Sequence, residues 1–404
     1  MRRVVVSGIG AVSSIGTSVP EIARGLCESR SGIIFNPEMQ ELGFRCQIYA
    51  PICNFSLPGS TGRLSVATQY AIAAAREAIA DAHLEPSELA SPRVGVILGT
   101  ILGGINDANA IERRLLEHRA PQRSDASAVV KILNSSAASQ VACEMGARGR
   151  VYSINSACST GPDAIGHAFE LIAYGFQDVV LCGATEEDTW RQMGPSYDNW
   201  TAMPIAYNDR PKQACRPFET HRSGFVLASG AGVLILEEYE AARKRDAQIY
   251  AEVVGYGSAN DGADMVHPTG LGARRAVGQA LEAAAKAGVR SIDYLNPHGA
   301  GTPVGDSIEV AWIKDILADK MPLVSSTKAL TGHAMGAAGA LEAVYTLIML
   351  RRGFVAPTLN LDEVAADCDG VPHVREAMQC SIEAAMTVNV GLGGSNAAVV
   401  FSQI

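Results

Sequence analysis

The amino-acid sequence predicts an α/β protein made of two halves of similar order. Short runs rich in β-branched residues alternate along the 404 residues with Ala-rich runs of helical composition. The predicted strands are continuously apolar, which is typical of a sheet that helices cover on both faces. The same alternation begins again after residue 249, and this repetition indicates an internal duplication.

The first half is expected to span residues 1–243. Its helices are expected at Leu64–Ala82, which contains neither Gly nor Pro, and at Ser159–Tyr174, which Gly175 ends. A segment over about residues 103–140 is rich in charge and Ser, and we expect it to be an insertion of loops and helices. The expected strands are Val4–Ile9, Val94–Gly99, Arg150–Ile154, Asp178–Ala184 and Gly230–Glu237.

The second half, residues 244–404, repeats this order after a charged joint within Glu237–Ile249. Its last two strands are expected to form an antiparallel pair. The expected strands are Tyr250–Tyr256, Ile292–Asn296, Leu323–Ser326, Ala385–Val390 and Ala397–Phe401, and the expected helices are Arg274–Ala287, Ser307–Leu317 and Ala334–Leu350.

Composition excludes several classes of protein. Charged residues make up 19% of the chain, against about 25% in average soluble chains, which indicates a large interior or a surface covered by another subunit. The net charge of −9 argues against a nucleic-acid binder. The longest apolar run, Ala334–Leu350, contains Glu342, so no membrane span is expected. Nine cysteines without a C-x-x-C pair indicate neither a disulfide framework nor a zinc site, and a cytosolic protein is expected.

Cys158 is the first candidate catalytic residue. It lies in SINSACSTG, where a predicted strand ends and a helix begins. A helix N-terminus favours thiolate, and its backbone N–H groups can face an oxyanion. A nucleophile on a strand-to-helix turn is a recurrent arrangement, although a buried structural cysteine is the alternative.

Two histidines follow predicted strands in the second half. His298 lies in NPHGAGT and His333 in STKALTGHA. Either one alone could be a packing residue, but the ends of strands in an open α/β sheet gather at one edge, where ligands bind. Metal binding by Cys158, His298 and His333 is the alternative. The position of the thiol at a helix start favours a nucleophile instead, and no metal is expected.

The loop Asn389–Asn396 is rich in Gly and lies between two predicted strands. It is followed by strand residues and lacks a Lys, which argues against a dinucleotide site. Close approach of its backbone to a ligand, or a second oxyanion donor, fits the glycines. A plain hairpin turn explains them equally well.

These motifs together resemble the β-ketoacyl-acyl carrier protein synthases, which are condensing enzymes of the thiolase fold, and within them the elongating synthase I type. The resemblance covers essentially the whole chain. It rests on VVVSGIGAVSSIG, SINSACSTG, YAEVVGYGSANDGADMV, YLNPHGAGTPVGD, STKALTGHAMGAAG and the final Gly391–Ala397. It implies a duplicated five-layer αβαβα arrangement with mixed sheets.

The resemblance also implies an activity, which is decarboxylative condensation of an acyl-enzyme thioester with malonyl-acyl carrier protein, as in fatty acid elongation. Cys158 would carry the acyl group, His298 and His333 would stabilise the enolate, and the N–H groups of Cys158 and Leu392 would form the oxyanion hole. No cofactor is implied, because the substrates carry their own phosphopantetheine. Lys328 and Glu342 match a buried pair, which either serves catalysis or is a plain structural ion pair.

Other positions imply contacts with substrate. Thr302 matches a residue that contacts pantetheine. The chain departs from the family pattern with Val390 and Leu392 where many elongating synthases carry Phe, and with Ala300 in place of a Thr that bonds pantetheine. Further substrate contacts are expected at Gly391 and Asp163, and Asp306 matches a position that braces the His298 loop. These departures keep open a ketosynthase of a type II polyketide or aryl-polyene pathway with the same chemistry.

The implied partner is an acidic acyl carrier protein. Arg63, Arg123 and Lys131 are candidate contacts for it, and scattered solvated charges are the alternative. A homodimer is expected, or a heterodimer with a chain-length partner. A thiolase acting on coenzyme A esters is disfavoured because Gly391–Gly393 lacks the second Cys of that class. A non-catalytic partner subunit is disfavoured because the chain keeps its nucleophile.

Overall fold

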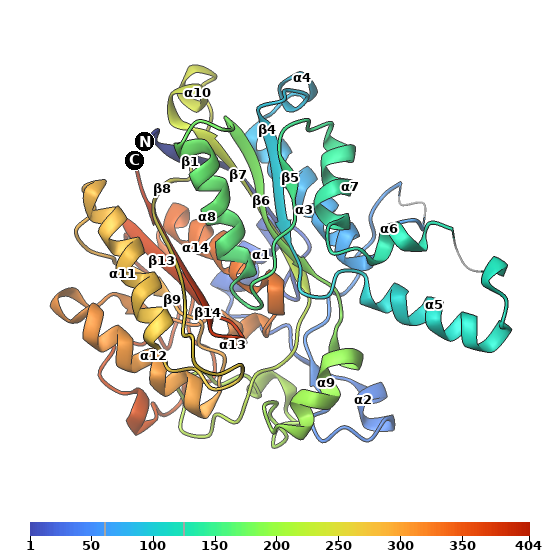
Figure 1. The fold of residues 1–404 in the computed structure, drawn as a ribbon. Helices are drawn as coiled ribbons and strands as arrows, with labels where there is room; N and C mark the ends of the chain where they lie inside the picture. Colours follow the sequence, from blue (N-terminus) through green and yellow to red (C-terminus); the bar gives the residue numbers. More distant parts are fainter. Residues whose placement is uncertain (60–61, 124–125) are drawn as a thin grey trace.

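A single ten-stranded mixed sheet runs through the molecule (Figure 1). The computed structural model describes residues 1–404 except 60–61 and 124–125, and except the side chain of residue 123. From one edge to the other, the strands are β10 (Leu323–Val324), β9 (Tyr294–Asn296), β13 (Ala384–Val390), β14 (Ser395–Ser402), β8 (Ala251–Asn260), β1 (Val4–Val12), β7 (Gly230–Glu238), β6 (Val179–Glu186), β4 (Val94–Gly99) and β5 (Val151–Tyr152).

The strand order confirms the duplication. Counted from the centre of the sheet, each half places its first strand next to its fifth, then its fourth, second and third. The directions also repeat, with two antiparallel pairings followed by two parallel ones in each half. The separate sheets expected from the resemblance are joined, because β1 and β8 pair at Val5–Glu252 and Val6–Ala251. The boundary at residues 243 and 244 stays a prediction.

Three pairs of helices complete the five layers. Helices α8 (Thr160–Ala173) and α14 (Ala338–Arg352) contact each other and strands of both halves, so they form the middle layer. Residues 338–350 of α14 are all buried, and a helix with so little solvent contact contributes to the low charged fraction. The outer layers are α3 (Val66–Ala82) with α7 (Ser136–Met145), and α11 (Leu271–Lys286) with α12 (Pro303–Ile316).

The two outer helix–strand contacts are built in the same way. A Cβ atom on Gly10 of β1 would lie 2.0 Å from the carbonyl oxygen of Ala74 in α3. A Cβ atom on Gly257 of β8 would lie 2.0 Å from the carbonyl oxygen of Ala276 in α11. Glycine in these strands therefore lets each Ala-rich helix approach its sheet backbone to backbone.

The insertion forms α5 (Ile105–His118), α6 (Ala128–Ile132) and the beginning of α7, and α5 projects from the body (Figure 1). Several predicted bounds were wrong by a few residues. The helix expected from Ser307 begins at Pro303. Proline suits the first helical turn because it lacks a backbone N–H, and the N–H groups of that turn have no acceptor within the helix. The helix expected from Ala334 begins at Ala338, after the 3-10 turn Met335–Ala337.

Short elements fill the remaining connections. Among the described residues, no helix is both long and apolar enough to cross a membrane. The short elements are α1 (Val19–Cys27), β2 (Ile34–Phe35), α2 (Pro37–Glu41), β3 (Ile48–Tyr49), α4 (Pro86–Leu89), α9 (Trp190–Asn199), α10 (Tyr239–Lys244), α13 (Lys328–Thr331), β11 (Phe354–Val355) and β12 (Met378–Gln379).

Candidate active site

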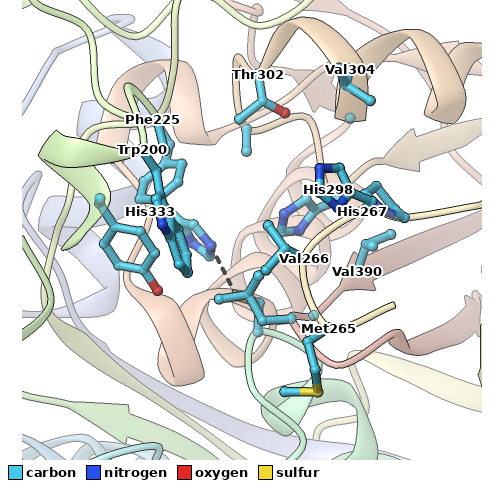
Figure 2. A pocket seen from close by; sticks show the side chains of 18 of the residues that line it. Trp200, Phe225, Met265, Val266, His267, His298, Thr302, Val304, His333 and Val390 are labelled. Atoms are coloured by element: carbon cyan, nitrogen blue, oxygen red, sulfur yellow. Dashed lines mark hydrogen bonds between the residues drawn. The ribbon is translucent and has the colours of Figure 1, made fainter. Parts of the chain in front are cut away.

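Four loops meet at a cavity of about 280 Å³. Cys158 lies between β5 and α8, His298 follows β9, His333 follows α13, and Leu392 lies in the turn between β13 and β14. The structure therefore brings together the predicted nucleophile, both predicted histidines and the Gly-rich loop. Figure 2 shows His333 on one side of the cavity and His298 on the other.

Cys158 is buried at the start of α8, with 5% of its surface exposed. The preceding Ala157 has a φ of 53°, a left-handed conformation that turns the chain sharply into the helix. A Cβ atom on Gly391 would lie 3.1 Å from the backbone nitrogen of Cys158. Glycine at this position therefore lets the β13–β14 loop lie directly against the nucleophile.

The expectation that the helix start favours thiolate is wrong for the resting state. Burial raises the pKa of the Cys158 thiol to about 11. Lys328 and the backbone N–H of Leu392 act in the opposite direction, but they do not overcome the desolvation of the anion. The cysteine therefore rests as a thiol, with the Leu392 N–H already directed at its sulfur.

The two histidines face each other across the cavity. Their ring centroids are 5.2 Å apart with an interplanar angle of 84°, and His333 Nε2 lies 3.2 Å from the Cys158 sulfur. Burial is the largest cause that holds both pKa values well below the ordinary histidine value, and the charge of Lys328 lowers them further. Both rings are therefore neutral, and a neutral imidazole offers one N–H donor.

Lys328 and Glu342 form a buried ion pair, as expected. Lys328 also donates a hydrogen bond of 2.6 Å to the backbone carbonyl of His298, and Asn389 donates one of 2.8 Å to Glu342. The pair thus connects the His298 loop with α13, α14 and β13. Burial raises the pKa of the Glu342 carboxyl, and the Lys328 charge opposes that rise.

Glu309 was not foreseen from the sequence. Its carboxyl accepts hydrogen bonds from the backbone N–H groups of His298, at 2.8 Å, and Gly299, at 2.6 Å. Burial raises its pKa to about 8. Asp306, one turn earlier on α12, accepts from Gly301 at 3.1 Å, so both acids brace this loop. An acidic residue three positions after Asp306 on a buried helix face was the available signal.

Residues 1–242 match the family model described as "Beta-ketoacyl synthase, N-terminal domain", and residues 250–362 match "Beta-ketoacyl synthase, C-terminal domain".

The chain belongs to the β-ketoacyl synthase family.

It is 40% identical to 3-oxoacyl-[acyl-carrier-protein] synthase 1 of Escherichia coli K12 over 100% of both chains. A β-ketoacyl synthase from Burkholderia phymatum STM815 matches with a TM-score of 0.93 and 34% identity over 100% of both chains, which confirms the predicted fold class. The structure of AntDE:AntF, a type II polyketide ketosynthase with its acyl-carrier protein, matches with a TM-score of 0.90 and 30% identity, covering 100% of this chain and 99% of that one.

The cavity of this β-ketoacyl synthase includes most of the expected substrate contacts. Thr302, Ala300, Val390 and Gly391 all line it, together with Leu392. An aromatic wall that the sequence analysis did not single out completes the lining. It consists of Tyr197, Trp200 and Phe225, and the edge of Phe225 meets His333 with ring centroids 5.5 Å apart.

The remaining expected contacts lie elsewhere in this β-ketoacyl synthase. Asp163 does not line the cavity, and it accepts hydrogen bonds from Ser156 and Tyr256 behind the nucleophile. Arg63 is exposed, and the side chain of Arg123 lies outside the described residues. Lys131 is largely buried and lies 3.6 Å from Asp107 in an ion pair. Neither Arg63 nor Lys131 lines the cavity, and the role of all three basic residues as carrier contacts stays a prediction.

Proposed function

We propose that this β-ketoacyl synthase condenses an acyl group held on Cys158 with a malonyl group carried by an acyl carrier protein, giving a 3-oxoacyl thioester. The observation that carries the proposal is the arrangement of one buried thiol and two neutral histidines around a single cavity, with His333 Nε2 at 3.2 Å from the sulfur. The similarity of the chain to the 3-oxoacyl-[acyl-carrier-protein] synthase 1 of Escherichia coli K12 supports the same conclusion.

In the first half-reaction, the Cys158 sulfur attacks the thioester of the carrier-bound acyl group. A new bond forms between this sulfur and the acyl carbon, the bond to the carrier's sulfur breaks, and the thiol proton ends on the departing carrier thiol. The raised pKa of Cys158 requires stabilisation of the developing thiolate. The N–H of Leu392, the charge of Lys328 and an N–H on His333 Nε2 supply it.

In the second half-reaction, the malonyl thioester oxygen accepts hydrogen bonds from His298 and His333. Carbon dioxide leaves, and the resulting enolate carbon attacks the acyl carbon on Cys158, whose carbon–sulfur bond then breaks. The released Cys158 thiolate takes up a proton from water and returns to the resting thiol. The N–H groups of Cys158 and Leu392 hold the oxyanion of the tetrahedral intermediate. Each such donor stabilises the transition state by roughly 3 kcal/mol. These steps use no cofactor besides the phosphopantetheine of the substrates.

The partners follow from the same proposal. An acyl carrier protein delivers both substrates, as the structural neighbour with its bound carrier suggests. The protein forms a homodimer in the cytoplasm. Edge strand β5, which has only β4 as a neighbour among the described strands, offers an open edge to a second copy. All nine cysteines lie in the described ranges and are free thiols, as expected in a reducing compartment.

The deciding experiment uses Cys158→Ala with acyl and malonyl carrier substrates. Condensation should be lost while labelled carbon dioxide is still released from malonyl carrier protein, because the two histidines remain. Full condensation by the variant would refute the proposal. Mass spectrometry of the acyl adduct on Cys158, with a panel of acyl carriers, then separates fatty acid elongation from a polyketide or aryl-polyene pathway. Gel filtration of the active protein alone tests the homodimer against a heterodimer.

A further inference from the structure

A second, smaller cavity lies behind the catalytic His298. It has a volume of about 30 Å³, and its lining includes His298, Glu309, Trp312, Asn396 and Ala273. His298 lines the large cavity as well, so this residue borders both spaces. Trp312 and Asn396 are both nearly inaccessible to solvent, at 0% and 1% exposure. The small cavity therefore has a buried polar wall and borders a catalytic side chain.

Three buried polar atoms of residues around this cavity have no hydrogen-bond partner among the described residues. They are Trp312 Nε1, Asn396 Oδ1 and His298 Nδ1. The amide nitrogen of Asn396 already donates to three acceptors, of which the carbonyl of Gly394 is the nearest at 2.6 Å, so only its oxygen is left over. Both carboxyl oxygens of Glu309 are used by backbone N–H groups.

Leaving such atoms unpaired is costly, and one water in the cavity that their three residues line is the simplest common partner for them. Each buried polar atom without a partner destabilises a protein substantially, so native structures rarely leave several together. A water molecule needs roughly 10–15 Å³ of such space and two to four polar partners. A water here would accept from the indole N–H of Trp312 and donate its two hydrogens to Asn396 Oδ1 and His298 Nδ1.

We propose that this cavity holds one ordered water, bound by Trp312 and Asn396, which fixes the tautomer of His298. A water that donates to Nδ1 keeps this nitrogen unprotonated, so the single proton of the neutral ring is on Nε2. Since Nδ1 is enclosed, Nε2 is the nitrogen left to reach the large cavity. Trp312 and Asn396 are then positioning residues for the N–H that meets the malonyl thioester. This role for His298 rests on the proposed function.

Two variants perturb the water without touching the catalytic groups. Trp312→Phe keeps the aromatic volume and removes the N–H donor. Ala273→Val adds two methyl groups to the cavity wall from α11 and displaces the water. The matched control is Thr346→Val, which deletes a different buried, unpartnered hydroxyl in α14. Thermal melting of each variant shows whether it is folded.

Malonyl decarboxylation and Cys158 acylation are measured separately on the whole protein. Trp312→Phe and Ala273→Val should each slow decarboxylation about tenfold, while acylation of Cys158 and the KM for malonyl carrier protein stay as in the wild type and the control keeps both activities. Wild-type decarboxylation in Ala273→Val would overturn the proposal, and this variant decides if Trp312→Phe fails to fold.

Two readouts need no turnover, so they remain decisive if the proposed function fails. A crystal structure that resolves waters should show one within hydrogen-bond distance of the three atoms, and none in Ala273→Val. The ¹⁵N spectrum of histidine-labelled protein should show Nδ1 of His298 unprotonated, with its signals identified by their loss in His298→Gln. A dry cavity, or a proton on Nδ1, would overturn the proposal.

Discussion

The variant Lys328→Met removes the cation of the buried ion pair while keeping most of the side-chain volume. Lys328 and Glu342 are 1% and 2% exposed, so the Glu342 carboxylate would be left without its counter-charge in the protein interior. Breaking such a pair costs about 3–5 kcal/mol, and whole proteins have only about 5–15 kcal/mol of stability. The midpoint of urea unfolding should fall by a correspondingly large amount.

The same substitution changes the titration of the active site. The Lys328 charge lowers the pKa values of both His298 and His333, so its removal raises them. Both imidazoles should then take up their second proton at a higher pH, so any acid-side change in activity should shift to a higher pH than in the wild type. The assay is release of labelled carbon dioxide from malonyl carrier protein, followed from about pH 5 to about pH 9.

The double variant Lys328→Met/Glu342→Leu separates the structural role of the pair from its catalytic role. Replacing both partners by apolar groups should restore most of the lost stability. It should not restore decarboxylation, which we expect to stay at least about tenfold below wild type, because the His298 carbonyl has lost its 2.6 Å donor. Full decarboxylation in a stable double variant would refute this reasoning and leave a plain structural ion pair.

Further predictions concern packing and protonation. Gly10→Ala should destabilise the protein by about 1–3 kcal/mol, since its Cβ would meet a backbone oxygen at 2.0 Å. Gly278→Ala, with open space around its Cβ, should stabilise helix α11 by up to about 1 kcal/mol. A melting temperature equal to that of the wild type in either variant would contradict the prediction for that variant. Alkylation of Cys158 by iodoacetamide should rise with pH toward about 11, and a plateau near neutral pH would disprove the resting thiol. Burial raises the pKa of Glu309 from 4.5 to about 8, so the folded state holds a proton that the unfolded chain releases. This contribution to stability is complete below the unfolded pKa and is lost as pH rises through the folded one, at about 1.4 kcal/mol per unit in between. Glu309→Gln should remove that pH dependence in urea titrations.

The positions of the catalytic side chains could be predicted from the sequence, but their pKa values could not. Cys158, His298 and His333 could be recognised because strand ends in an α/β sheet converge, and this needs only the order of elements. The pKa of Cys158 could not be read in the same way, because it depends on desolvation by every segment that packs around the sulfur. Glu309 escaped notice for a related reason, since its bonds to the His298 loop depend on how α12 sits against that loop.

The joining of the two halves also lay beyond pattern reasoning. Strand composition predicted both halves of the sheet, but the pairing of Val5 with Glu252 depends on register between distant segments. Asp163 shows the same limit at the site. The family resemblance implied a substrate contact for Asp163, whereas its carboxyl accepts hydrogen bonds from Ser156 and Tyr256.

The duplicated topology explains why the site forms where it does. Cys158 follows β5, the third strand of the first half, and His333 follows β10, the third strand of the second half. Although β5 and β10 are the two edge strands of the sheet, the segments that follow them meet, with 3.2 Å between the Cys158 sulfur and His333 Nε2. His298 follows the second strand of its half. The equivalent loop of the first half, after β4, likewise has two consecutive backbone N–H groups, at Ile101 and Leu102, bound to a buried carboxyl, that of Glu186, but it carries no histidine. The two halves therefore share a fold that brings their loops to one place, where the first half supplies the thiol and the second half supplies both histidines.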